Sequence, residues 1–266
     1  MNEDRPVSED RPRGQNAGSR RFRRGASILP SLFTTGNLFL GFWSIVRSLN
    51  GQFEPAAALI FGAIVLDMLD GRIARLTGTA SEFGGEFDSL ADAISFGVAP
   101  ALLAYQWGFQ AIPRVGWLAA FLFVMCGVLR LARFNVQRHS VDARYFVGLP
   151  IPAAAGQAAT LVYFWPSPVV ERVRALLIVA VLLVLAFLMV STFRYLSFKG
   201  VDLRRRRSYI TVLGIALLFV LIAQHPDVSL LAVATLYTLS GPSIYVAGLL
   251  RRRGDPPPAV ATGAAH

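Results

Sequence analysis

The sequence has little charge, one cysteine and one lysine. Only 16% of its 266 residues are charged, whereas a soluble domain carries about a quarter, so there are too few charges to cover a water-soluble globule of this size. The single cysteine, Cys126, excludes an intramolecular disulfide and a thiolate metal cluster. It lies in an apolar run, where we expect a buried thiol. Because Lys199 is the only lysine, almost all of the positive charge behind the net +10 is arginine.

The sequence instead contains long runs of apolar residues. Hydrophobic residues make up 54% of the chain, and a membrane-spanning helix needs about 20 largely apolar residues. Candidate spans occur at residues 28–49, 53–74, 88–108, 115–135, 150–166, 174–193, 208–224 and 228–249. The predicted fold class is an all-α integral membrane protein with about eight transmembrane helices. The fifth and seventh runs are short.

The arginines are distributed unevenly between the two ends of these spans. With eight spans, all but four of the 26 basic residues fall on one side, the exceptions being Arg47, Arg114, Arg172 and Arg174. Basic loops favour the cytoplasmic side. We therefore expect a multi-pass protein of the cytoplasmic membrane with both termini in the cytoplasm. The arginines punctuate apolar runs, which favours anionic membrane lipids over nucleic acid as a partner, above all at residues 204–207.

The two ends of the chain are polar. Residues 1–27 lack an apolar core beside the start and a small-residue cleavage site, so a secretory signal is not expected. They are predicted to be a disordered basic cytoplasmic tail, and residues 251–266 a disordered C-terminal tail.

Four aspartates interrupt the apolar runs within a short stretch. Asp67 and Asp70 are three residues apart, and Asp88 and Asp92 are four apart, so each pair shares one face of a helix. The intervening TGTASEFGG is a turn of small residues. Two carboxylates should thus face two carboxylates at the cytoplasmic boundary. Unpaired, they would repel at high cost, whereas Mg²⁺ or Mn²⁺, and in particular two ions with a pyrophosphate, would remove that cost.

The aspartates also fit two alternative roles. They could form ion pairs with Arg72 and Arg75, which are close in sequence. They could also mark an ion path, because intramembrane acids are typical of channels and transporters. A metal-dependent transporter, however, predicts acids spread along several spans, and here they crowd into one hairpin.

The pattern D-x2-D-G-x2-A-R-x8-G-x3-D-x3-D, from Asp67 to Asp92, resembles the signature of the CDP-alcohol phosphatidyltransferase family at every fixed position. The resemblance implies an integral membrane enzyme that uses divalent metal to displace CMP from a CDP-linked lipid with an alcohol. It also implies a core of six transmembrane helices, here residues 28–200. Residues 201–250 would then be an additional pair of helices.

The resemblance assigns roles to particular residues. Asp67, Asp70, Asp88 and Asp92 would hold metal, and Asp92 would also be the general base. The CDP-lipid would contact Gly71, Ala74, Arg75, Ser81 and Gly84. The Ser81 hydroxyl could instead be a local cap. In the first span, Thr34 and Asn37 could approach the nucleotide, although interhelical hydrogen bonds would account for them equally well.

Five further stretches are similar to the phosphatidylserine synthase branch: LPSLFTTGNLFLGF, EFDSLADAISFGVAPA, RLARFNV, FVGLPIPAAAG and RYLSFKG. That branch transfers the phosphatidyl group of CDP-diacylglycerol to the hydroxyl of L-serine, giving phosphatidylserine and CMP. Arg130 and Arg133 share a helix face that suits a carboxylate, with Asn135 close by. They could also be ordinary membrane anchors, and Asn135 could end a helix. Glycerol 3-phosphate, inositol phosphate and choline stay alternative acceptors, and relatives suggest a homodimer.

Overall fold

The computed structural model describes residues 28–77, 81–137 and 145–196, together with residues 213–254 apart from 215, 218, 219 and 222. The elements follow in the order α2 (Ile28–Leu49), α3 (Phe53–Thr77), α4 (Glu82–Asp92), the π-helix η1 (Ala93–Val98), α5 (Ala99–Gly108), α6 (Pro113–Gln137), β1 (Tyr145–Val147), α7 (Ile151–Phe164), α8 (Arg172–Val190), β2 (Arg194–Leu196) and α10 (Pro226–Gly254). Because α4, η1 and α5 run on without a break, these elements comprise 7 continuous helical segments.

The prediction of an all-α membrane protein is confirmed at the level of class. Every predicted span except the seventh coincides with one of these segments, and the largest difference is the third, which begins at Glu82 rather than at residue 88. Four segments of the described chain are long and apolar enough to cross a membrane: Glu82–Gly108, Pro113–Val136, Arg172–Val190 and Pro226–Ala247. Helix α3 is not among these four, and it carries Asp67 and Asp70 in its second half.

Several predictions fall outside the described residues. The seventh span, residues 208–224, lies largely there, so the count of eight stays a prediction. Lys199, the arginines at 204–207 and the N-terminal tail also lie outside. At the other end, α10 continues to Gly254, four residues into the segment predicted as a tail.

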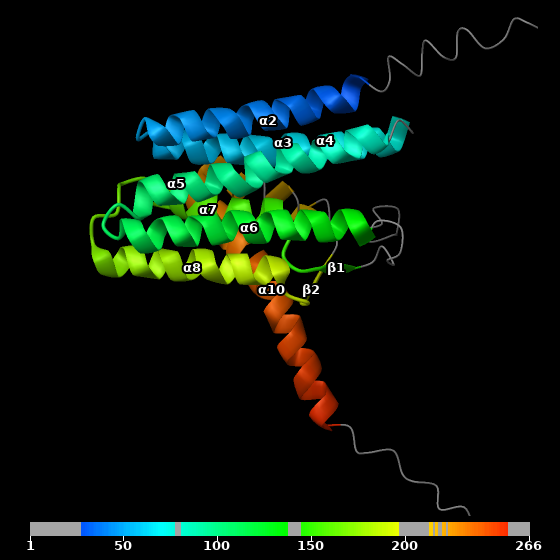
Figure 1. Cartoon of the computed structure of the whole chain (residues 1–266). Helices are drawn as coiled ribbons and strands as arrows, with labels where there is room; N and C mark the ends of the chain where they lie inside the picture. Colours follow the sequence, from blue (N-terminus) through cyan, green and yellow to red (C-terminus); the bar gives the residue numbers. More distant parts are fainter. Residues whose placement is uncertain are drawn as a thin grey trace, which may run out of the picture.

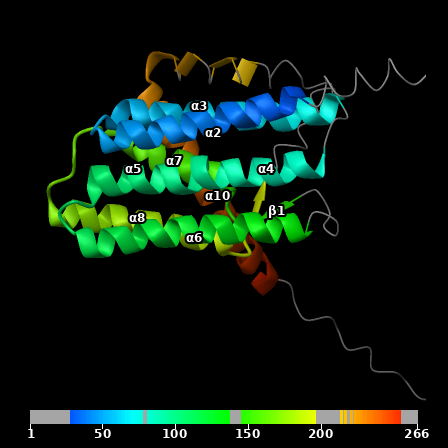
Figure 2. The same ribbon diagram turned by 45° about the horizontal axis from the view of Figure 1, so that its top comes forward.

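The helices form a bundle with α7 in its interior. The α2–α3 hairpin forms one side and α6 with α8 the other, and the continuous α4–η1–α5 segment lies between them with α7 (Figure 1 and Figure 2). Most residues of α7 are buried, among them Ala154, Ala155 and Ala159. Small residues let helices approach closely in a membrane protein, and Gly156 of α7 faces Ile64 of α3 in this way.

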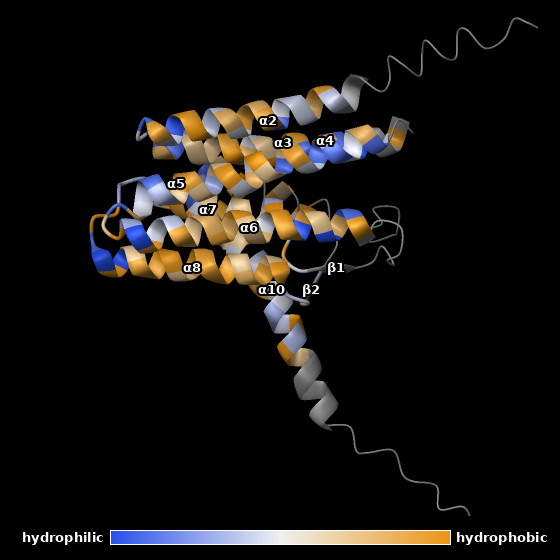
Figure 3. Ribbon diagram, viewed as in Figure 1, coloured by the Kyte–Doolittle hydropathy of each residue, from blue (hydrophilic) through white to orange (hydrophobic). Residues whose placement is uncertain are grey.

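Hydrophobic side chains cover most of the outside of the bundle. Figure 3 shows hydrophobic residues along most of α6 and α8, and a hydrophilic stretch along α4. Phe121 and Leu129 of α6 and Phe187 of α8 are exposed although they are large and apolar, as expected for surfaces that meet lipid. Cys126, predicted to be buried, is half-buried against the core. The hydrophilic stretch on α4 is therefore an exception to the apolar outer surface of the bundle.

A short antiparallel sheet is the one departure from helix among the described elements. Strand β1 pairs with β2 so that Phe146 lies opposite Tyr195. The chain leaves β1 through Gly148, whose φ of 83° favours glycine and whose absent Cβ avoids the carbonyl oxygen of Met189. Tyr195 is completely buried, and β2 packs on α10. The sheet therefore joins the end of α8 to α10, which crosses the direction of the other helices (Figure 1).

The π-helix η1 follows Asp92 directly. A π-turn adds a residue to the helical repeat and is frequent at functional sites. Within η1, the Ser95 hydroxyl donates to the backbone carbonyl of Asn37 on α2 at 3.1 Å. A Cβ at Gly41 would overlap Ser95, so glycine is what allows α2 and η1 to come this close. This contact fixes the position of Asp92 along α2, because Asp92 directly precedes η1.

Candidate active site

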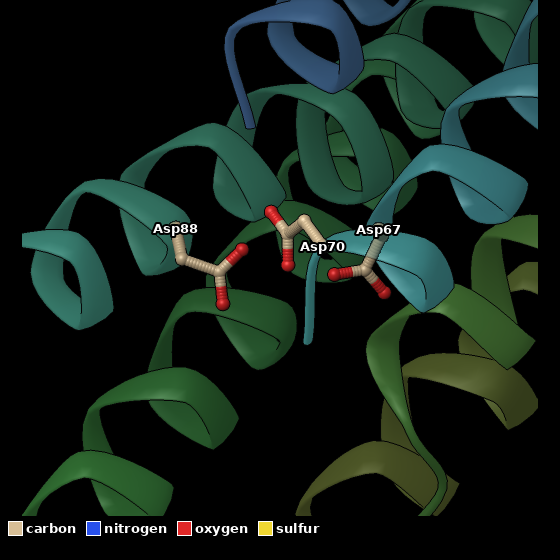
Figure 4. A group of neighbouring side chains, drawn as sticks. All are labelled: Asp67, Asp70 and Asp88. Carbon is tan, nitrogen blue, oxygen red and sulfur yellow. The ribbon is translucent and has the colours of Figure 1, made fainter. Parts of the chain in front are cut away.

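Three of the four aspartates form one group. Asp67 and Asp70 come from α3 and Asp88 from α4, and one carboxylate oxygen of each lies within 4.8 Å of the others. Their carboxylates point into a common space (Figure 4). Asp70 is buried, while Asp67 and Asp88 are half-buried. The predicted arrangement of facing carboxylates is therefore confirmed for these three.

Asp92 is not a member of that three-carboxylate group. It is the last residue of α4 and is buried, 8% exposed. Its Oδ1 accepts a hydrogen bond from the Asn37 amide at 3.2 Å, and the charges of Asp67 and Asp88 still act on it. The signature thus yields a three-carboxylate group and a buried fourth carboxylate, and the metal-ligand role predicted for Asp92 stays a prediction.

Helix α2 supplies a hydrogen-bond donor to each of these two regions. The Thr34 hydroxyl donates to Asp70 Oδ2 at 2.7 Å, and Asn37, one turn later, donates to Asp92. A hydrogen bond to a charged group is worth about 1.5–3 kcal/mol. The interhelical bonds considered for Thr34 and Asn37 are therefore present, and both of them orient aspartates.

The donor set of the three-carboxylate group fits a hard divalent cation. Carboxylate oxygens are the ligands that Mg²⁺ and Mn²⁺ prefer. Three negative charges this close repel one another in a low-dielectric setting unless a cation lies among them. Thr34 takes up one oxygen of Asp70 and leaves the other available. The group could hold a metal.

The residues predicted to contact the CDP-lipid surround this group unevenly. Among the described residues, no atom outside the helix's own backbone and the adjacent residues lies within 4 Å of the position a Cβ would take at Gly71, so this part of the structure leaves the backbone there open to a ligand. Ser81 caps α4, because its Oγ accepts from the Gly84 amide at 3.0 Å; the alternative of a local cap holds for Ser81. The side chains of Ala74 and Arg75 lie outside the described part of the structure.

The three residues predicted to bind the acceptor separate in the structure. Arg130 lies inside, and the charge of Asp92 acts on it. Asn135 instead joins α6 to α4: its Nδ2 donates to Ser89 Oγ at 3.1 Å and to Glu86 at 3.5 Å. Arg133 is half-buried one turn from Arg130. Of these three residues, Arg130 is the one that the described structure places near Asp92.

Comparison with known proteins agrees with this geometry. The model of the family described as CDP-alcohol phosphatidyltransferase matches residues 27–193. The chain belongs to the CDP-alcohol phosphatidyltransferase family.

Several relatives in this family are similar over more than two thirds of their own length. A CDP-diacylglycerol–serine O-phosphatidyltransferase of Helicobacter pylori is 41% identical over 198 residues, covering 73% of this chain and 82% of the relative. Proteins of the same name from Bacillus subtilis and Methanocaldococcus jannaschii are 34% and 38% identical. These two matches cover 65% and 57% of this chain, and 92% and 69% of the respective relative.

One residue near the site lies beyond the part of the chain that matches the family. Tyr237 of α10 lies near Arg130, and α10 begins at Pro226, after the matched residues end at 193. Sequence reasoning missed Tyr237 because an aromatic residue in an apolar span carries no spacing signal. It missed Ser89 and Ser95 for a similar reason, since hydroxyls are ordinary in membrane helices.

Proposed function

We propose that this chain transfers the phosphatidyl group of CDP-diacylglycerol to the hydroxyl of L-serine, giving phosphatidylserine and CMP. The observation that carries the proposal is the pairing of the group formed by Asp67, Asp70 and Asp88 with the buried Asp92, to which Asn37 donates a hydrogen bond. Transfer to an alcohol needs both a site for the phosphates and a base for the hydroxyl, and the two regions suit these tasks. The name shared by the similar proteins supports serine as the acceptor.

Asp67, Asp70 and Asp88 would hold Mg²⁺ or Mn²⁺, and two ions would suit the pyrophosphate. With metal bound, the site would neutralise the charge that the phosphates bring and that grows during transfer. The chain's own residues do the rest. Thr34 keeps the Asp70 carboxylate turned toward the group, and the open space beside Gly71 admits the CDP-lipid. By resemblance, Arg75 would pair with a phosphate there.

Asp92 would act as the general base. The serine hydroxyl oxygen forms a bond to the phosphorus that carries diacylglycerol. The bond from that phosphorus to the oxygen of CMP breaks, CMP leaves with that oxygen, and the hydroxyl proton passes to Asp92. Asn37 holds one oxygen of Asp92 and so fixes the direction of the other. A carboxylate is a weak base for an alcohol, so positioning and charge neutralisation must supply most of the acceleration.

The acceptor would bind where Arg130 approaches Asp92, with Arg133 on the same face of α6. Asn135 would act indirectly, through its bonds to Ser89 and Glu86. The excess of arginine at one end of the spans supports an active site and both termini in the cytoplasm. Residues 28–200 would form the catalytic core, with 201–250 as an addition, and a homodimer is a further proposal.

The experiment is CMP release by the purified protein with CDP-diacylglycerol and Mn²⁺ or Mg²⁺, comparing serine, glycerol 3-phosphate, inositol phosphate and choline. Release with serine alone is the expected result. Release with another alcohol would keep the roles of the aspartates and remove the serine assignment. A folded protein that binds metal and releases no CMP with any acceptor would contradict the proposal.

A further inference from the structure

Arg130 has a hydrogen-bond donor that nothing in the described structure uses. Its Nε is buried and has no hydrogen-bond partner among the described residues. Arg130 lies within the apolar segment Pro113–Val136, where an arginine is costly and where such residues serve function more often than folding. Two groups lie near it, the carboxylate of Asp92 and the phenol of Tyr237. Arg130 is therefore close both to the candidate base and to helix α10.

Helix α10 is anchored at the turn that carries Tyr237. Tyr195 of β2 is completely buried, and its hydroxyl donates to the carbonyl of Thr238 at 3.2 Å. Its ring lies 5.8 Å from that of Tyr237 and against the backbone of Gly241, where a Cβ would overlap it. Burial raises the pKa of Tyr195 to about 12, so the phenol keeps the proton that it donates. The β1–β2 sheet thereby holds Tyr237 in place.

The geometry of arginine makes the unused Nε informative. A guanidinium binds a carboxylate through two parallel N–H donors, and one such pair consists of Nε and a terminal nitrogen. In serine, the carboxylate carbon and the hydroxyl oxygen are separated by only two carbon atoms. A carboxylate held by Arg130 therefore brings the hydroxyl close to the carboxylate that acts on Arg130, which is Asp92.

We propose that helix α10, through Tyr237, positions the Arg130 guanidinium to receive the carboxylate of an amino-acid acceptor beside Asp92. Tyr237 is a positioning residue: it acts through Arg130. The proposal rests on the proposed transfer to serine and extends it to a helix outside the family match. In this chain, the acceptor pocket is complete only when α10 is docked.

The test is the kinetics of Tyr237→Phe, which removes one hydroxyl and keeps the ring that meets Tyr195. Serine is varied at saturating CDP-diacylglycerol, and then the lipid at saturating serine, with the full chain and Mn²⁺. The KM for serine should rise about tenfold, with kcat and the KM for the lipid changed less than about twofold. Tyr245→Phe is the matched control: it lies on the same helix but meets Phe193, at 5.1 Å, and should behave as wild type.

A second variant tests the anchor without touching Arg130 or Tyr237. Gly241→Ala adds a Cβ that must displace the Tyr195 ring. If α10 works through its docked position, this variant should also raise the KM for serine more than that for the lipid. A folded Gly241→Ala protein with both KM values unchanged contradicts the anchoring.

The wild-type acceptor panel and the variant kinetics separate two failures. If wild type uses serine and Tyr237→Phe leaves its KM within twofold, the inference is wrong and the proposed function stands. An equal rise in both KM values would indicate a general structural role and would also overturn the inference. If wild type uses only an acceptor without a carboxylate, the serine assignment and this inference fail together.

Discussion

Two regions of the active site contain the same side chain and differ in almost everything else. The three-carboxylate group of Asp67, Asp70 and Asp88 spans two helices, and two of its members are half-buried. The second region surrounds Asp92, which is buried, hydrogen-bonded to Asn37 and near Arg130. Asp92 follows Asp88 by a single helical turn. The difference teaches that, under the proposed function, environment and not residue type would divide the labour between metal binding and proton transfer.

Asp92→Asn should separate the two regions most sharply. The amide keeps the shape and the contact with Asn37 but cannot take a proton. We expect turnover to fall about 10²- to 10⁴-fold, with Mn²⁺ affinity changed little and the thermal unfolding temperature retained. CMP release and Mn²⁺ titration on the same preparation measure both. Turnover like that of wild type would remove the general-base role from Asp92.

Asp88→Asn is the reciprocal experiment. It removes one charge from the three-carboxylate group, so Mn²⁺ should bind at least about tenfold more weakly. Turnover should fall and recover in part as Mn²⁺ is raised, which it should not do in Asp92→Asn. If Asp88→Asn binds Mn²⁺ as tightly as wild type, the metal site does not include Asp88.

Asn37→Ala should weaken the second region alone. It removes the hydrogen bond to Asp92 Oδ1, worth about 1.5–3 kcal/mol. We expect kcat to fall about ten- to a hundredfold, with the KM for the lipid nearly unchanged. Thr34→Val, which removes the bond to Asp70, is the control and should act on Mn²⁺ affinity instead. Identical profiles for the two variants would contradict the division.

Two glycine substitutions should distinguish packing from ligand access. Gly41→Ala places a Cβ on Ser95 and should destabilise the fold by about 1–3 kcal/mol, which thermal unfolding measures. Gly71→Ala meets no atom of the described structure. It should therefore leave the unfolding temperature unchanged and raise the KM for CDP-diacylglycerol several-fold. A normal KM in Gly71→Ala would mean that the lipid does not approach this backbone.

Arg133→Ala should have the smallest effect. Arg133 shares a face of α6 with Arg130, but of the two it is Arg130 that lies near Asp92. We expect the KM for serine to rise about two- to fivefold, more than that for the lipid. The KM for serine is measured for Arg133→Ala and Arg130→Ala in the same assay. An unchanged KM in Arg133→Ala would indicate that Arg133 is an anchor at the membrane surface.

Much of this protein follows from local patterns in its sequence. The length and hydropathy of the apolar runs predict the helices from α2 to α8 to within a few residues, because a bilayer demands apolar segments of a set length. The spacing of Asp67, Asp70 and Asp88 predicts that they face one another, because helical periodicity puts residues three and four apart on one side. Both predictions depend on neighbours in the chain.

Only the tertiary structure decided which aspartate is not a member of the three-carboxylate group and which residues surround it. Asn37 is distant from Asp92 in sequence, and its role depends on how α2 packs against η1 through Gly41 and Ser95. The π-turn itself leaves no mark in the hydrophobic pattern. The role proposed for Tyr237 depends on Tyr195, which docks α10. Sequence periodicity describes one helix at a time, whereas these contacts arise from the packing of several, and packing depends on shape.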